Sequence, residues 1–267
     1  MKKIVSLIMT LIIAVVSAVT MVGCKEPAKK LYVYTNAGFA PYEYLDQSGK
    51  VVGVDIDIMN AIGQELGYEV VVNDIDFEQI LNEVASNEMA VGAAGMTQKA
   101  SRDEICAASI SYATSVQYVI VPTGTFDSAD LVEGKLPVAK LAEVSVNGIG
   151  VQSGTTGSFL IEDALADGGD LATSGKSMFE YKDAIVASQD IGSNVGAVII
   201  DKLPAQQIAG ANAGLECFEL DAEPESYVLY LNKNATELLA QINAILEEMI
   251  ANGTIDQYTI NHSGGNA

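Results

Sequence analysis

Apolar and polar positions follow two periods along this chain, one of two residues and one close to the pitch of a helix. Alternating or β-branched segments predict strands, and segments with an apolar stripe on one face predict helices. The first helix is expected to start at an Asp55 cap and to end at Gly67. We expect strands at 31–34, 68–72, 89–94, 118–121, 148–152, 195–200, 215–220 and 227–231, and helices at 55–66, 77–85, 155–166, 181–188, 202–209 and 235–251.

Two interruptions break this alternation, one from Pro122 to Asp127 and one from Asp221 to Ser226. Strands that alternate with helices indicate parallel sheets covered by helices on both faces. The last third of the chain is too short to fold alone, so we expect it to return to the first. This predicts two α/β lobes with parallel-rich sheets, joined by a double-crossover hinge. Lobe 1 is expected at 31–121 plus 225–267 and lobe 2 at 122–224, with ligands held in the cleft between them.

The amino terminus has the pattern of an export signal. Two lysines precede an uncharged apolar run at 4–23, and Cys24 follows where the run stops. The ending Met21-Val22-Gly23-Cys24 resembles a bacterial lipobox, which predicts a signal peptide at 1–23 and a lipidated (palmitate-bearing) tether at 24–30. A membrane-spanning helix is the alternative. Both interpretations place the rest of the chain outside the cytoplasmic membrane, and the first anchors it there through Cys24.

Composition removes several classes of function. The chain has 14 basic and 35 acidic residues, a net charge of −21, which argues against nucleic acid as a partner. With one histidine (His262) and three well-separated cysteines, no zinc-type cluster is expected, and a Ser–His–Asp triad is nearly excluded. Cys106 and Cys217 are expected to be unpaired core thiols rather than a disulfide.

Two strand-to-helix junctions carry groups suited to an anionic ligand. Gly95–Arg102 follows the strand at 89–94 and contains the only arginine of the chain. A guanidinium binds a carboxylate through two parallel hydrogen bonds, although Arg102 could instead be a surface helix residue. Gln152–Gly157 follows another strand and opens a helix, whose first N–H groups suit an anion; a Ser/Thr-capped helix is the alternative.

A third junction offers the opposite charge. Asp201 ends the hydrophobic strand at 195–200 and is either the cap of the next helix or the partner of an ammonium group. Phe39 and Phe77 stand at corresponding junctions of lobe 1, either as core residues or as a sandwich for an apolar side chain.

In the order and spacing of its motifs the chain resembles the bacterial extracellular solute-binding proteins of family 3, the polar amino-acid receptors of ABC importers. The resemblance covers nearly the whole chain after the expected signal. The matching pieces are Ala40-Pro41-Tyr42-Glu43-Tyr44, Gly53-Val54-Asp55-Ile56-Asp57, Gly95-Met96-Thr97 with Arg102, Gly154-Thr155-Thr156-Gly157, Ala197-Val198-Ile199-Ile200-Asp201 and Asn252-Gly253-Thr254.

The resemblance implies a type II periplasmic-binding-protein-like fold and a set of ligand contacts. Arg102, with the backbone amides of Thr97 and Thr156, is expected to hold an α-carboxylate. Asp201, the Gly95 carbonyl and the Thr97 hydroxyl are expected to hold the α-ammonium. The remaining expected contacts are stacking by Phe39 and Phe77, side-chain contacts from Asn36 and Gln152, and Thr155.

The expected function is therefore that of a non-enzymatic, extracytoplasmic lipoprotein that binds a free polar L-amino acid in the interlobe cleft and delivers it to the permease of an ABC importer. A neutral Asn36, where receptors for cationic amino acids tend to carry an acid, argues against lysine or arginine as the ligand. We expect a monomer without metal or cofactor. The alternatives on the same fold are a cyclohexadienyl-dehydratase-like enzyme and a ligand-sensing module.

Overall fold

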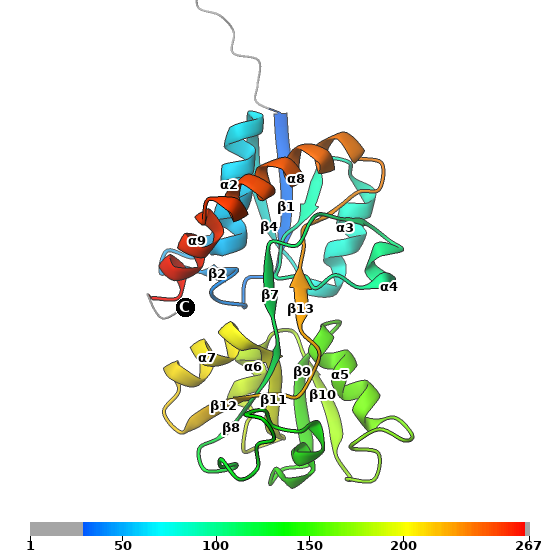
Figure 1. The fold of residues 1–267 in the computed structure, drawn as a ribbon, viewed down its shortest axis with the longest axis vertical. Helices are drawn as coiled ribbons and strands as arrows, with labels where there is room; N and C mark the ends of the chain where they lie inside the picture. Colours follow the sequence, from blue (N-terminus) through cyan, green and yellow to red (C-terminus); the bar gives the residue numbers. More distant parts are fainter. Residues whose placement is uncertain (1–28, 265–267) are drawn as a thin grey trace, which may run out of the picture.

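The computed structural model describes residues 29–264 as two α/β lobes stacked along the long axis of the molecule (Figure 1). The chain passes between the lobes twice. The connecting segments pair with each other as the short antiparallel strands β7 (Ala113–Ser115) and β13 (Glu225–Tyr227). The expected two-lobed architecture with its double-crossover hinge is confirmed. The predicted signal peptide at 1–23 and lipidated Cys24 lie outside the described residues.

The first lobe is built on a five-stranded sheet in the order β4-β1-β5-β14-β6. The first three strands are parallel, and Val33 of β1 lies between Val72 and Val91 of its neighbours. β14 is antiparallel to both of its neighbours, because it enters the sheet from the hinge rather than from a crossover helix. The strands are β1 (Lys29–Thr35), β4 (Tyr68–Asp74), β5 (Ala90–Gly92), β6 (Ala107–Ala108) and β14 (Tyr230–Leu231), and a separate hairpin joins β2 (Tyr44–Leu45) to β3 (Val51–Val52).

The second lobe repeats this plan in the order β10-β9-β11-β8-β12. β10, β9 and β11 are parallel, and β8 is antiparallel to both β11 and β12. Since β8 belongs to this sheet, the chain has already left the first lobe at Val116, earlier than the boundary at 121 expected from the sequence. The strands are β8 (Gln117–Pro122), β9 (Gly148–Gln152), β10 (Ser177–Tyr181), β11 (Val195–Asp201) and β12 (Leu215–Glu219).

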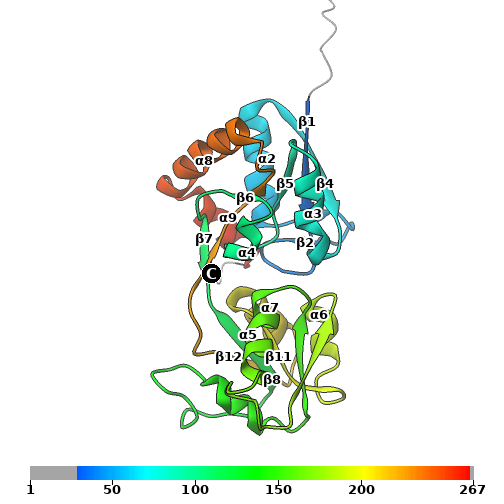
Figure 2. The same cartoon turned by 90° about the vertical axis from the view of Figure 1, so that its right-hand side faces the viewer.

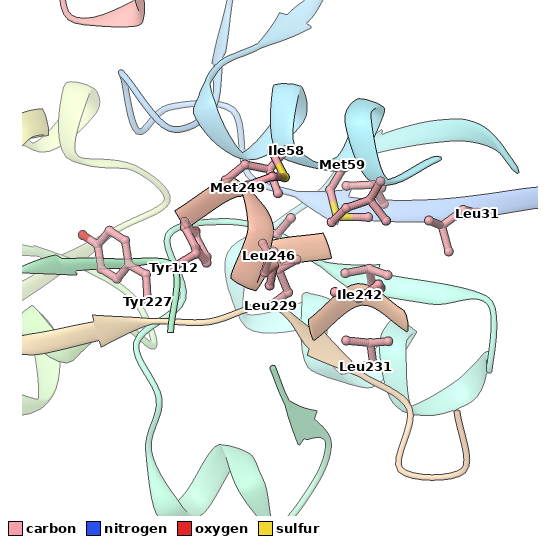
Figure 3. Packing of buried hydrophobic residues seen from close by; sticks show 14 of the residues in the cluster. Leu31, Ile58, Met59, Tyr112, Tyr227, Leu229, Leu231, Ile242, Leu246 and Met249 are labelled. Atoms are coloured by element: carbon pink, nitrogen blue, oxygen red, sulfur yellow. The ribbon is translucent and has the colours of Figure 1, made fainter. Parts of the chain in front are cut away.

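Helices cover the sheets and supply the apolar cores. In the first lobe, α8 turns Ile242, Leu246 and Met249 inward, one helical stripe that packs over Leu229 and Leu231 from the return segment (Figure 3). The helices are α2 (Val54–Leu66), η1 (Phe77–Gln79), α3 (Ile80–Ser86), α4 (Ala100–Asp103), η2 (Val138–Glu143), α5 (Thr156–Leu165), α6 (Ala184–Gln189), α7 (Lys202–Ala211), α8 (Thr236–Ala251) and α9 (Thr254–His262).

The first helix shows one correct and one wrong prediction at its ends. α2 ends at Gly67, whose φ of 73° is in the left-handed region that glycine adopts easily. Its start is not capped by Asp55. The N-cap residue is Gly53, and Asp55 is fully buried, where its carboxylate accepts hydrogen bonds from the Gly95 N–H at 2.9 Å and the Tyr112 hydroxyl at 2.7 Å.

Other elements also differ from the expectation. The helix expected at 181–188 is shorter, because 177–181 forms the edge strand β10 and Asp183 caps α6 by accepting the Val186 N–H at 2.7 Å. The strand expected at 227–231 is split between β13 in the hinge and β14 in the sheet. α9 was not predicted. Cys106 and Cys217 are free; Cys106 is buried, whereas Cys217 is partly exposed rather than a core thiol.

No helix within residues 29–264 has both the length and the apolar character needed to cross a bilayer. The same residues contain no group of three or more His, Cys, Asp or Glu side chains arranged to hold a metal ion.

Candidate functional site

The candidate site lies between the two lobes, which Figure 2 shows one above the other, and it is lined by residues at the carboxyl ends of strands from both sheets. β1 and β5 end there in the first lobe, and β9 and β11 end there in the second. All ten candidate residues line one pocket, which we call the interlobe pocket: Asn36, Phe39, Phe77, Gly95, Thr97, Arg102, Gln152, Thr155, Thr156 and Asp201. Glu43 and Ala94 complete its lining and were not predicted.

The interlobe pocket is closed by contacts between the lobes. The Arg102 guanidinium donates to the Gly154 carbonyl at 3.1 Å, and the Gln152 amide donates to the Asn36 side-chain oxygen at 2.8 Å. The cavity measures about 20 Å³, which is the space of a single water molecule. An amino acid is larger than this space, so the residues around the pocket have to move apart to admit one.

Arg102 is the cation of the pocket. It lies on α4, only 6% exposed, so the alternative of a surface helix residue is wrong. Its guanidinium donates to the Thr97 carbonyl at 2.8 Å and stacks over the Phe77 ring, 5.3 Å from the centroid. Burial lowers the pKa of Arg102, against the opposing influence of nearby carboxylates, but a guanidinium stays charged. Among the described residues Arg102 forms no salt bridge.

Asp201 brings the opposite charge from the second lobe. It is the N-cap residue of α7 by position, as one of the two alternatives had it, but its side chain makes no capping hydrogen bond and is directed to other partners. One carboxylate oxygen accepts from the Gln117 amide at 2.7 Å and the other accepts from the Tyr227 hydroxyl. Burial raises the pKa of Asp201, and the nearby charge of Glu225 raises it further. A carboxylate in this position is stabilised by any cation that enters the pocket.

The two threonines of the site share a buried partner in the hinge. The Thr97 hydroxyl, from the first lobe, and the Thr156 hydroxyl, from the second, both donate to the same carboxylate oxygen of Glu225. Neighbouring Thr155 caps α5 by accepting the Ser158 N–H at 3.3 Å, as the capped-helix interpretation of this junction anticipated. The first N–H groups of α5 therefore lie at the edge of the pocket.

The two aromatic candidates are partly core and partly lining. Phe39 packs against core clusters of both lobes, and its ring lies so close to Gly95 that a Cβ there would be 2.6 Å from it. Phe77 packs on the cluster under α3 and carries the Arg102 guanidinium on its face. Both rings therefore pack against core residues and also line the pocket, and their stacking on a ligand side chain stays a prediction.

Glu43 is the main residue that the sequence analysis missed. It is 1% exposed, and one of its carboxyl oxygens has no hydrogen-bond partner among the described residues. Burial and the neighbouring carboxyl of Asp55 raise the pKa of Glu43 well above its ordinary range. The only signal was its place in the Ala40–Tyr44 motif, which assigned it no role.

Comparison with known proteins gives a consistent result over almost the whole described chain. The sequence matches bacterial extracellular solute-binding proteins, family 3, over residues 31–264. Relatives include the arginine-binding extracellular protein ArtP of Bacillus subtilis (strain 168), 25% identical over 88% of this chain and 86% of its own. Another is a probable histidine-binding protein of Neisseria gonorrhoeae, 26% identical over 87% of this chain and 82% of its own.

A solved structure shares the fold as well. An ancestral arginine-binding protein bound to arginine superposes with a TM-score of 0.74 at 28% identity, covering 87% of this chain and 97% of that one. The family match, the related sequences and the shared two-lobed fold agree with one another. The chain therefore belongs to the bacterial extracellular solute-binding proteins of family 3.

Proposed function

We propose that this protein is a lipid-anchored extracytoplasmic receptor that binds a free polar L-amino acid in the interlobe pocket and delivers it to an ABC permease. One observation carries the proposal: Arg102 and Asp201 are buried opposite charges from different lobes that line the same pocket. A charge that enters a closed pocket without a partner costs several kcal/mol. An α-amino acid offers a carboxylate to the first and an ammonium to the second.

In this proposal the α-carboxylate replaces the Gly154 carbonyl as a partner of the Arg102 guanidinium. The N–H groups of Thr97 and of Thr156, at the start of α5, add donors for it. The α-ammonium lies between the Asp201 carboxylate, the Thr97 hydroxyl oxygen and the Gly95 carbonyl. Because the contacts come from both lobes, ligand favours closure by contacts that exist only in the closed form.

The ligand side chain is proposed to be polar and to donate hydrogen bonds. Asn36, Gln152 and Glu43 bring amide and carboxyl oxygens to the pocket, and one carboxyl oxygen of Glu43 has no hydrogen-bond partner among the described residues, so a ligand group can supply one. The names of the relatives, an arginine-binding and a probable histidine-binding protein, support this class of ligand. Neutral Asn36 still argues against a cationic ligand.

Replacing Glu43 with Gln separates cationic from neutral ligands. A cationic side chain favours ionised Glu43, so its affinity should fall at least tenfold in Glu43→Gln. A neutral polar ligand, which meets only a hydrogen-bonding group at that point, should change by less than about threefold. Isothermal titration calorimetry with L-arginine, L-histidine and L-glutamine measures the difference.

The proposal itself is tested by native mass spectrometry of the purified protein and calorimetry with the twenty amino acids. We expect one or a few polar L-amino acids to bind. Each analogue that lacks the α-amino or the α-carboxyl group should lose at least about a hundredfold in affinity. Absence of binding by every amino acid refutes the proposal. Conversion of a bound compound into product, seen by chromatography, would instead favour the dehydratase-like alternative.

The lipid anchor is a separate part of the proposal, and it rests on the lipobox-like ending at Cys24. Cells expressing the full chain should incorporate labelled palmitate into the protein and keep it in the membrane fraction. Cys24→Ser should lose the label and release the protein. Label retained by Cys24→Ser contradicts attachment at this cysteine.

A further inference from the structure

Glu225 is a buried carboxylate in the hinge that touches both lobes. It opens β13, is 8% exposed, and was not a candidate in the sequence analysis. One of its oxygens accepts the hydroxyl hydrogen bonds of Thr97 from the first lobe and of Thr156 from the second, the latter at 2.8 Å. Its other oxygen accepts from the Gln117 amide at 2.8 Å.

The hydrogen count at the threonines decides what they can offer a ligand. A hydroxyl has one proton to donate and two lone pairs. A carboxylate can only accept, so Glu225 takes the single proton of Thr97 and the single proton of Thr156. Toward the interlobe pocket, which both residues line, these hydroxyls can therefore act only as acceptors. An acceptor recognises a donor, such as an ammonium group, and repels a carboxylate or carbonyl oxygen.

We propose that Glu225 is a positioning residue that sets the polarity of the ligand site by holding the hydroxyl protons of Thr97 and Thr156 away from the pocket. It makes the site selective for an α-ammonium without contacting the ligand. This inference rests on the proposed function, because it assigns the selectivity of the same pocket. It goes beyond that function in naming a hinge residue as the source of the selectivity.

A second effect of Glu225 must be separated from this one. Its negative charge lies close enough to Asp201 to raise the pKa of that residue, so it also attracts an ammonium group through space. An attraction between charges does not depend on the Thr97 hydroxyl, whereas proton positioning does. The two effects are therefore distinguished by combining substitutions at 225 and 97.

The principal variant is Glu225→Gln, which keeps the shape of the side chain and reverses the direction of its hydrogen bonds with the two threonines. The Gln117 N–H₂ group is held by the Asp201 carboxylate at 2.7 Å and lies 2.8 Å from Glu225, so the amide oxygen of the new side chain should face it. The amide N–H₂ then faces Thr97 and Thr156 and donates to their oxygens, which turns their protons toward the pocket. Glu223→Gln is the matched control, because Glu223 is an exposed acid on the same hinge segment.

The measurement is a ratio of affinities. The first ligand is the amino acid that binds the native protein most tightly, whether L-arginine, L-histidine, L-glutamine or another. Calorimetry compares its affinity with that of the corresponding 2-hydroxy acid, in which a hydroxyl replaces the ammonium. We expect Glu225→Gln to lower the preference for the amino acid by about 10- to 100-fold, and Glu223→Gln to leave it within about twofold.

Thr97→Val tests the route and does not depend on the folding of the Glu225 variant. Thr97→Val should itself lower the ratio, and Thr97→Ser, which keeps the hydroxyl, should preserve it. In the Thr97→Val background Glu225→Gln should have a smaller effect, since only the hydroxyl proton of Thr156 remains to be turned. Circular dichroism spectra and melting temperatures accompany each variant.

The outcomes divide clearly. An unchanged ratio in folded Glu225→Gln, or a ratio kept by Thr97→Val, overturns the inference while leaving the proposed function intact. If the effects of Glu225→Gln and Thr97→Val on the affinity ratio are additive in free energy, the charge of Glu225 acts through space, and this result also overturns the inference. If the native protein binds no amino acid, both the proposed function and this inference fail.

Discussion

Replacing Arg102 with alanine is the most direct test of amino-acid recognition in this protein. The guanidinium is buried and donates to the carbonyls of Thr97 and Gly154 at 2.8 and 3.1 Å. At a separation of about 4 Å and an effective dielectric constant of about 20, its attraction for a ligand carboxylate is about 4 kcal/mol. Loss of that attraction corresponds to roughly a thousandfold weaker binding.

The same substitution should change the stability of the fold much less. Among the described residues Arg102 has no salt-bridge partner, so alanine leaves no buried carboxylate newly unpaired by a broken ion pair. Two hydrogen bonds from a charged group to carbonyls are lost, at about 1.5–3 kcal/mol each, and the cost of burying a cation, several kcal/mol, is removed. We therefore expect the free energy of unfolding to change by no more than about 2 kcal/mol.

Calorimetry measures the affinity, and urea unfolding followed by circular dichroism measures the stability. Lys50→Ala is the matched control, because it also removes a positive charge from the first lobe, and the Lys50 side chain is exposed and does not line the interlobe pocket. Arg102→Lys should recover only part of the affinity, since an ammonium lacks the fork of two parallel donors. An Arg102→Ala protein that binds its amino acid within tenfold of the native affinity would refute the assignment of the carboxylate site.

Three further predictions follow from the surroundings of the pocket. Gly95→Ala should destabilise the protein by about 1–3 kcal/mol in urea unfolding and weaken binding, because the φ of Gly95 is +51° and the new Cβ would be 2.6 Å from Phe39. Gly67→Ala is the control: its φ is +73° and no atom lies near the new Cβ, so it should show only the cost of the backbone conformation. Amino-acid affinity should fall by up to about tenfold per pH unit as the pH drops through the raised pKa of Asp201, because a proton then competes with the ligand ammonium for the carboxylate. Affinities measured by calorimetry that stay constant from about pH 8 to about pH 5 would contradict this. Burial raises the pKa of Asp55 to about 6, so the folded state binds protons more readily than the unfolded state. This residue should therefore add up to about 3 kcal/mol of stability as the pH falls from about 7 to about 4. Urea unfolding of Asp55→Asn should lack this pH-dependent component.

The repeated strand–helix pattern was sufficient to predict the two lobes and the return of the chain, because buried parallel strands and amphipathic helices leave strong periodic signals. Elements with weak signals were missed. The strand β10 (Ser177–Tyr181) is an edge strand that is mostly exposed, so it lacks an apolar run. The helix α9 (Thr254–His262) buries only Ile255, with Tyr258 packed partly buried beside it, so its apolar face is short.

The residues that line the pocket were predictable where a motif or a rare residue type marked them. Arg102 is unique in the chain, and Asp201 ends an apolar strand. Glu43 and Asp55 stand in motifs that gave no sign of their burial, and nothing local distinguishes Glu225 from the many exposed acids. Their burial depends on partners that come from distant segments, such as the Gly95 N–H for Asp55 and the two threonines for Glu225. Long-range contacts of this kind are not visible in periodicity.

The way Arg102 is held has a consequence for the evolution and engineering of this receptor. Two carbonyls of the main chain fix the guanidinium, and no neighbouring side chain supplies a hydrogen bond to it among the described residues. Substitutions at Asn36, Glu43 or Gln152 can therefore change the chemistry of the pocket around the ligand side chain without removing a hydrogen bond of Arg102. Mutant libraries restricted to these three positions are a rational source of biosensors with new selectivity on an unchanged scaffold.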